Sequence, residues 1–388
     1  MRICFALLSP TFGMHQYTAD LANRMADTSN RSSTLIGMTG HETHLVTTCR
    51  YPSDRYAPDV LVHTPVSCDS TGFDQSGLDL AAVQATIRTI RRIKPDLVHI
   101  TGPHLWNIPL LIALRKANIP VIQTIHDLVP HPGADHRYFI YLWNTLIRKL
   151  TSHLLVHGEC YQRQLLMMGT PEDQVTYTPL LHLFLGYPPL EARPHTDLES
   201  SYERYVLFFG RFKSYKGLPH LLKSWKQGRQ NGARLVLAGP GDLDALWSDP
   251  LPPKVEVRNR IIQDKEALDL FRRCSLVVLP YTGATQSALI AAAYHFNKPV
   301  IVSQSGALPE YVLHGQSGWV VPPADADALA RYLKIGLADP ARLQQMGAVG
   351  RAWYDKQRRV EERTLLSMYI SLRTSVPVRT GQLLPRPA

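Results

Sequence analysis

At the centre of the chain stands Tyr205-Val-Leu-Phe-Phe-Gly210-Arg211-Phe-Lys-Ser-Tyr-Lys216-Gly217-Leu-Pro-His-Leu-Leu-Lys-Ser-Trp225. Residues 205–209 predict a buried strand and residues 218–225 a helix, joined by a turn that carries two cations. In open parallel sheets, ligands bind beyond the carboxyl ends of the strands, where this turn lies. An arginine fork and a lysine point charge suit a diphosphate. A solvated loop with incidental charges is the alternative, and the spacing alone favours neither.

The alternation of strand and helix continues outward from this turn in both directions. Upstream it predicts a helix at 80–93 and strands at 2–7, 97–100 and 120–125. Downstream it predicts strands at 234–238, 255–258, 276–280, 299–302 and 319–321, then a long charged helix from about residue 340 to 373. Residues 187–201 are rich in proline and polar side chains and have no apolar period, which is typical of a linker. The chain therefore predicts two α/β domains.

Composition limits the class of protein. The chain has 388 residues, 45% of them hydrophobic, enough for two separate cores. Its five cysteines lie far apart and form no CxxC pair, so we predict neither disulfides nor a zinc site, and a cytoplasmic location. No uncharged apolar run approaches the roughly 20 residues of a membrane helix. A net charge of +10 favours anionic partners, but no nucleic-acid-binding signature is present, so no nucleic acid partner is predicted.

Several further segments, taken together with the 210–217 turn, resemble the retaining glycosyltransferases of family 4. The turn is similar to that family's Gly-Arg…Lys-Gly donor motif, and Ser9-Pro-Thr-Phe-Gly13-Met14-His15 resembles its first glycine-rich loop. Leu235-Val-Leu-Ala-Gly239-Pro-Gly241-Asp242 resembles the following strand and loop of its second domain. Its strongest signature is matched by Pro299-Val-Ile-Val-Ser-Gln-Ser-Gly306-Ala-Leu-Pro-Glu310 with Gly315-Gln-Ser-Gly318. The resemblance extends over about residues 1 to 370.

The resemblance implies the GT-B architecture, in which two Rossmann-like domains face each other across a cleft and a C-terminal helix packs back on the first domain. We predict an acceptor-binding domain at 1–185, a linker at 186–204 and a nucleotide-sugar-binding domain at 205–360. A helix at 361–375 returns to the first domain, and residues 376–388 form a flexible tail.

One segment departs from the family pattern. The family carries two glutamates separated by seven residues, and the anchor at Pro299 places those positions at Ala284 and Ala292. Both carboxylates are absent. The segment Ala284-Thr-Gln286-Ser287 resembles a variant branch of the family, and its amide and hydroxyl can still bond sugar hydroxyls.

The resemblance assigns roles to named residues. Arg211, Lys216 and His126 are the predicted catalytic residues, although His126 read alone is a loop histidine capped by its neighbour Asp127. The predicted donor-binding residues are Gly13, Met14, Gly210, Gly239, Gln286, Ser287, Ala288, Leu289 and Glu310. The predicted acceptor-side residues are His99, His104 and Asp127, and 157–159 is a further candidate for the cleft.

No metal or other cofactor is predicted. Asp242-Leu-Asp244 and Asp325-Ala-Asp327 match the Asp-x-Asp pattern that single-Rossmann glycosyltransferases use to hold a divalent cation. The first follows a Gly-Pro-Gly turn and the second follows two prolines, where aspartate caps a helix. We therefore interpret both as caps.

Residues 138–150 are aromatic-rich and end in Arg148-Lys149. Such a helix can lie on a bilayer surface at the inner face of the plasma membrane and admit a lipid-linked acceptor. A core helix with a charged end is the alternative.

The predicted function is transfer of a glycosyl group from a UDP- or GDP-linked sugar to a hydroxyl of a glycan, lipid-linked or small-molecule acceptor, with retention of configuration. It implies a role in bacterial polysaccharide, glycolipid or related glycoconjugate biosynthesis. A sugar-nucleotide epimerase or phosphorylase on the same fold, or a degenerate transferase that only binds, are the alternatives. A nicotinamide dehydrogenase is disfavoured because no GxGxxG follows the first strand.

Overall fold

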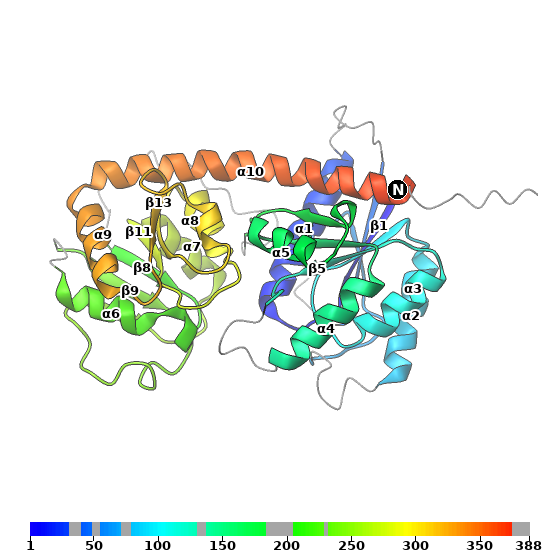
Figure 1. Ribbon diagram of the computed structural model, residues 1–388, viewed down its shortest axis with the longest axis horizontal. Coiled ribbons are helices and arrows are strands. Elements are labelled where there is room, and N and C mark those ends of the chain that lie inside the picture. The colour runs from blue at the N-terminus through cyan, green and yellow to red at the C-terminus, as the bar shows by residue number, and fades with distance from the viewer. Residues whose placement is uncertain are drawn as a thin grey trace, which may run out of the picture.

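We describe the protein from a computed structural model. The structure describes residues 1–30, 40–48, 55–70, 79–129, 137–183, 205–228 and 232–374. The predicted linker at 186–204 and the predicted tail at 376–388 lie outside these residues, as does Cys49. Two parallel sheets, each flanked by helices, lie side by side (Figure 1). This arrangement confirms the predicted two-domain α/β fold.

The N-terminal domain holds a seven-stranded sheet in the order β3-β2-β1-β4-β5-β6-β7. Its strands are β1 (Arg2–Leu7), β2 (Glu42–Thr47), β3 (Val60–His63), β4 (Leu97–Ile100), β5 (Val121–Ile125), β6 (His153–Val156) and β7 (Val175–Tyr177). Its helices are α1 (Phe12–Asn30), α2 (Leu80–Ile93), α3 (Asn107–Lys116), α4 (Arg137–Leu150) and α5 (Glu159–Met167). The strand order reverses between β1 and β4, so the connections after these two strands leave in opposite directions.

The C-terminal domain repeats the plan with six strands in the order β10-β9-β8-β11-β12-β13. These are β8 (Tyr205–Phe209), β9 (Arg234–Ala238), β10 (Val255–Arg258), β11 (Leu276–Leu279), β12 (Val300–Ser303) and β13 (Gly318–Val321). The helices are α6 (Leu218–Gln227), α7 (Asp264–Arg273), α8 (Leu289–His295) and α9 (Ala326–Ala338), with short 3₁₀ turns η4 (Ser214–Lys216) and η5 (Leu308–Tyr311). Here the reversal lies between β8 and β11.

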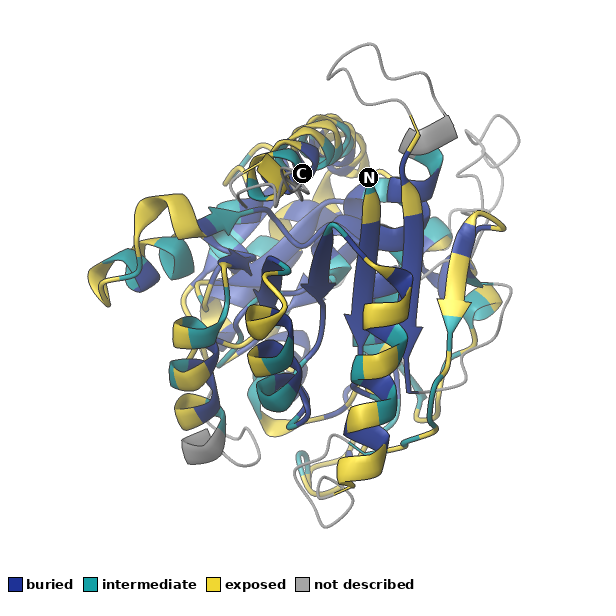
Figure 2. Ribbon diagram, turned by 90° about the vertical axis from the view of Figure 1, so that its right-hand side faces the viewer, coloured by how far each residue is buried: buried dark blue, intermediate teal, exposed yellow. Residues whose placement is uncertain are grey.

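The central strands are apolar because helices cover both faces of each sheet. The strands β1, β4, β5 and β6 are almost entirely dark blue in Figure 2, whereas the helices around them show exposed outer faces. Helix α2 begins where Asp79 accepts a hydrogen bond from the amide of Ala82 at 2.9 Å, and it turns Val83 and Ile90 inward. Burial of such apolar faces against the sheet holds the helices in place.

Helix α10 (Pro340–Thr374) connects the two domains and spans the top of both in Figure 1. It packs against α8 and α9 of the C-terminal domain and against β4 of the N-terminal domain. Four charged residues join it to α1: Arg358 contacts Asp20 at 2.8 Å, and Arg24 contacts Glu361 at 3.1 Å. The C-terminal helix therefore packs back on the N-terminal domain, as predicted.

No helix in the described part of the chain combines the length and apolarity that crossing a bilayer requires.

Candidate functional site

The turn after β8 is shaped by glycines that no other residue can replace. Gly217 has φ +71°, and a Cβ there would lie 1.8 Å from the carbonyl oxygen of Pro280. Gly239 has φ +144°, and a Cβ there would lie 2.2 Å from the oxygen of Gly210. Gly210 in turn donates to the oxygen of Ala238 at 2.8 Å. The loops after β8, β9 and β11 are therefore in backbone contact at the carboxyl edge of the sheet.

The two cations of this turn differ in their surroundings. Lys216 Nζ lies 3.8 Å from the centre of the Tyr281 ring and 5.3 Å from that of Tyr215. Burial lowers the pKa of Lys216 to about 8, with Arg211 contributing in the same direction and Tyr215 opposing. Arg211 is exposed. The Lys216 ammonium thus lies over the Tyr281 ring, whereas the Arg211 guanidinium faces solvent.

The loop 282–287 follows β11 and contains Ala284, the position predicted to match the first glutamate of the family pattern. The amide of Ala284 donates to Ser305 Oγ at 2.9 Å, and the hydroxyl of Thr285 donates to Asp127 Oδ1 at 2.5 Å. Gln286 Oε1 is buried and has no hydrogen-bond partner among the described residues. Ser287 is buried beside it. Thr285 and Ala284 thus tie this loop to the N-terminal domain and to the 305–307 turn.

The start of α8 completes this side of the site. Ala288 precedes the helix and Leu289 opens it, with the Leu289 side chain directed at Gly210. Ala292, the second position where the family carries a glutamate, is fully buried in the core. A carboxylate there would therefore stand among apolar side chains in this chain.

His126 lies at the carboxyl end of β5. Its Nε2 donates to the oxygen of Thr101 at 2.9 Å, and its ring meets those of Tyr17 and His157 at 5.0 and 5.2 Å between centres. Burial lowers its pKa, so the ring is neutral at pH 7 and keeps Nδ1 as an acceptor. The same domain contributes Gly13 and Met14 at the start of α1, where a Cβ on Gly13 would meet nothing within 4 Å.

Three of the predicted residues are engaged elsewhere. His99 is fully buried, with Nδ1 2.8 Å from the hydroxyl of Tyr369 on α10 and Nε2 2.8 Å from Thr124 Oγ1. His104 is also buried and accepts from the amide of Trp106. Glu310 caps α5, because its two oxygens accept from the amides of Glu159 at 2.6 Å and Cys160 at 2.9 Å. The structure therefore places these side chains in packing and domain contacts.

Sequence reasoning did not single out Tyr281, Thr285 or Tyr161, which line the same junction. Tyr281 follows directly after β11, so the rule that ligands bind beyond strand ends was a signal for it. Thr285 lies in the same loop, within the segment 284–287 that departs from the family pattern, but its partner Asp127 is 158 positions away and Tyr161 is 124 positions from Thr285, so no sequence signal pairs them.

Both Asp-x-Asp pairs cap turns of the backbone. Asp242 Oδ1 accepts from the amide of Ala245 at 3.0 Å, and Asp325 Oδ1 accepts from that of Ala328 at 2.8 Å. Within the described residues, no group of three or more His, Cys, Asp or Glu side chains is arranged to hold a metal ion. The four described cysteines, Cys4, Cys68, Cys160 and Cys274, form no disulfide.

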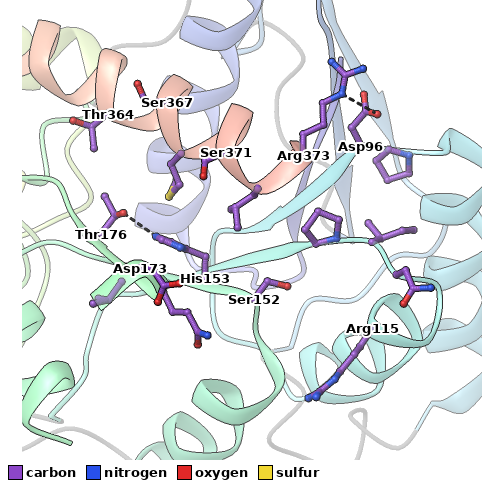
Figure 3. A pocket seen from close by; sticks show the side chains of 18 of the residues that line it. Asp96, Arg115, Ser152, His153, Asp173, Thr176, Thr364, Ser367, Ser371 and Arg373 are labelled. Carbon is purple, nitrogen blue, oxygen red and sulfur yellow. Dashed lines mark hydrogen bonds and ion pairs between the residues drawn. The ribbon is translucent and has the colours of Figure 1, made fainter. Parts of the chain in front are cut away.

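A hollow of about 1560 Å³ lies at the opposite, amino-terminal edge of the N-terminal sheet. Figure 3 shows its polar lining, in which His153 Nε2 contacts Thr176 at 2.8 Å and Arg373 of α10 pairs with Asp96 at 3.6 Å. It is lined by the starts of β5, β6 and β7 and by the last turns of α10. It is therefore separate from the strand ends that carry Arg211, Lys216 and His126.

Comparisons with known proteins agree with this geometry. Residues 203–339 match the family model "Glycosyl transferases group 1" and residues 12–180 match "Glycosyl transferase 4-like domain". Glycogen synthase from Mycobacterium tuberculosis is 26% identical over 72% of this chain and 71% of that protein. Trehalose phosphorylase from Pleurotus pulmonarius is 23% identical over 66% of this chain but only 41% of that protein.

Among solved structures, Anabaena HepE in complex with UDP and glucose has a TM-score of 0.66 at 16% identity, covering 96% of this chain and 99% of that one. That likeness concerns the fold. The two family models together account for most of the chain from residue 12 to residue 339. The chain therefore belongs to the group 1, or family 4, glycosyltransferases with the GT-B fold.

Proposed function

We propose that the protein transfers a glycosyl group from a UDP- or GDP-linked sugar to an acceptor hydroxyl with retention of anomeric configuration, in the synthesis of a polysaccharide, glycolipid or related glycoconjugate. The observation that carries this proposal is the turn at 210–217, where Lys216 Nζ lies 3.8 Å from the centre of the Tyr281 ring and Arg211 is exposed. Donor identity is supported by HepE, which was solved with UDP and glucose.

In the proposed reaction, the bond between sugar and diphosphate loosens while negative charge builds on the leaving phosphate. Arg211 and Lys216 are aimed at that charge before the reaction begins, which lowers the barrier by electrostatic preorganisation. Gln286 Oε1 and the free Nδ1 of His126 accept from sugar hydroxyls. The acceptor attacks from the face that the diphosphate leaves, and a phosphate oxygen takes its proton. No metal takes part.

A thermal-shift screen tests donor binding. A nucleoside diphosphate present at a hundred times its Kd adds about 2.7 kcal/mol to the stability of the folded state. We expect UDP or GDP to raise the melting temperature in EDTA, and product analysis to find a new glycoside only when acceptor is added. Consumption of donor without acceptor would identify an epimerase, and a requirement for inorganic phosphate a phosphorylase. No shift with any nucleotide would contradict the proposal.

We further propose that α4 contacts a membrane surface, where a lipid-linked acceptor is available. Tyr141 and Leu142 are 56% and 57% exposed, and Leu146 is 40% exposed one turn after Leu142. Lys149, in the last turn of the helix, is exposed, whereas the Arg148 guanidinium donates to the backbone oxygen of Met168 at 2.8 Å. Exposed apolar side chains next to a cation suit an interface of anionic lipid.

Replacing Leu142 and Leu146 together with glutamate is expected to weaken binding to vesicles containing phosphatidylserine about tenfold or more, because two apolar groups are lost and two negative charges added. Co-sedimentation at 0.1 M salt measures this. The matched control is Ile261→Glu, which changes an exposed isoleucine of the C-terminal domain. Equal binding of wild type and the double variant would overturn the membrane contact.

A further inference from the structure

We infer that Asp127 is a positioning residue of the C-terminal domain's donor site: it acts from the N-terminal domain, through the hydroxyl of Thr285, to hold the loop 282–287 in place. This inference rests on the proposed function, because that proposal assigns binding of the donor sugar to the loop. The hydrogen bond between Thr285 and Asp127 joins the two domains, and its effect on the loop can be measured without substrate.

The bond joins a buried donor to a charged acceptor. Thr285 is 4% exposed, and its Oγ1 lies 2.5 Å from Asp127 Oδ1. The hydroxyl of Tyr161, which is also in the N-terminal domain, donates to the backbone oxygen of Thr285 at 3.3 Å. The hydroxyl and the backbone oxygen of Thr285 thus each contact the N-terminal domain. Hydrogen bonds to carboxylates are about twice as strong as those between neutral groups.

The loop is held from behind by its own domain. The amide of Ala307 donates to the oxygen of Thr285 at 2.9 Å. Gly306 has φ +54°, and a Cβ there would lie 2.1 Å from the oxygen of Ala284, so the 305–307 turn lies directly against the loop. Without Asp127, the Thr285 hydroxyl would lose the partner that fixes the loop from the opposite side.

Asp127 is itself held in a fixed place. It directly follows His126 at the end of β5, and its backbone oxygen accepts from Asn144 Nδ2 at 2.9 Å. The same nitrogen donates to the oxygen of Leu128 at 3.0 Å, and Asn144 is 4% exposed. The carboxylate therefore projects from a rigid segment, which is what a positioning group requires.

The position of the Gln286 side chain depends on this bond, because Gln286 is the residue next to Thr285 in the loop. Its buried Oε1 has no partner in the described part of the chain, so its placement relative to a sugar hydroxyl depends on the loop. A shift of the loop by about 1 Å is enough to cost on the order of a hundredfold in rate. Asp127 would thus couple His126 on one domain to Gln286 on the other.

The test compares substitutions that keep or remove the bond. Thr285→Val is nearly isosteric but has no hydroxyl, whereas Thr285→Ser keeps it. Asp127→Ala removes the acceptor, whereas Asp127→Asn keeps an oxygen that can accept. We expect Thr285→Val and Asp127→Ala to raise the donor KM about tenfold or more, and Thr285→Ser and Asp127→Asn to restore most of the loss. Asp244→Ala, which removes an exposed carboxylate of the C-terminal domain, is the control.

Hydrogen exchange of the loop amides gives a readout that needs no substrate. The amides of Ala284 and Ala307 should exchange about tenfold faster in Thr285→Val and Asp127→Ala than in wild type, and not in Thr285→Ser. Unchanged exchange in both variants would overturn the inference even if the wild type is an active transferase. Asp127→Asn separates positioning from base catalysis. If this variant is as inactive as Asp127→Ala while its loop amides exchange at the wild-type rate, Asp127 acts as a base and the positioning role is wrong. If the loop amides exchange faster in Thr285→Val and Asp127→Ala than in wild type, but the wild type binds no nucleotide, only the proposed function is rejected.

Discussion

Lys216→Ala is expected to lower turnover by about a hundredfold or more, and Arg211→Ala to do the same, by analogy with removal of one preorganised donor to an oxyanion. Both cations lie at the carboxyl edge of the C-terminal sheet, on the turn whose backbone touches the loops after β9 and β11. Steady-state rates with the donor identified by the thermal-shift screen measure the effect.

The same turn offers a matched control. Lys213 is an exposed lysine three residues before Lys216, so Lys213→Ala removes an equal charge from the same segment. It should leave turnover within about twofold, because an exposed cation is screened by water and salt. Near-normal turnover in Lys216→Ala or Arg211→Ala would remove that residue from the mechanism.

The burial of Lys216 also predicts how donor binding depends on pH. Its pKa is lowered to about 8, so the free protein loses this charge as the pH rises through 8, whereas a bound diphosphate favours the charged form. Donor affinity should therefore fall between pH 7 and pH 9 in wild type. Lys216→Ala has weaker affinity throughout and lacks this step. Calorimetric titration with the nucleoside diphosphate at the two pH values measures it.

Local sequence predicted the elements of the fold better than the contacts of the site. The strands of the C-terminal domain follow from apolar runs such as Tyr205–Phe209, because parallel strands are buried on both faces. The turn of Arg211 and Lys216 follows from its place after such a strand. By contrast, His99 and Glu310 have partners on α10 and α5, far away in sequence, and no pattern specifies which of their possible partners the packed structure selects.

The second large effect concerns the ion network that fixes α10 to the N-terminal domain. Arg358 donates to Asp20 through both terminal nitrogens, at 2.8 and 3.0 Å, and lies 3.5 Å from Glu361. The side chains of Arg358 and Asp20 are 19% and 14% exposed. Burial alone would raise the pKa of Asp20, but Arg358 and Arg24 outweigh it and hold the value at about 2. Asp20 therefore keeps its charge in the folded protein.

Arg358→Met is expected to lower the free energy of unfolding by about 3 kcal/mol, because it leaves two buried carboxylates with one remaining guanidinium. Urea denaturation measures this, with Arg359→Met as the control, since Arg359 is exposed on the next position of α10. The stability that Asp20 contributes is present above its ordinary pKa and is lost as the pH falls through about 2. In Arg358→Met the loss should begin at a higher pH. If the free energy of unfolding of Arg358→Met falls at the same low pH as that of wild type, Arg24 alone holds Asp20 ionised.

The same variant links stability to the site. Helix α10 packs on α8 and α9 at one end and on β4 at the other, so it sets how the two domains face each other. If its attachment to α1 loosens, the Asp127–Thr285 contact between the two domains should loosen with it, although neither residue touches Arg358. We therefore expect Arg358→Met to raise the exchange rate of the Ala284 amide and the donor KM together, while Arg359→Met changes neither. A destabilised variant with a normal donor KM would show that the α10 network and the donor site are independent.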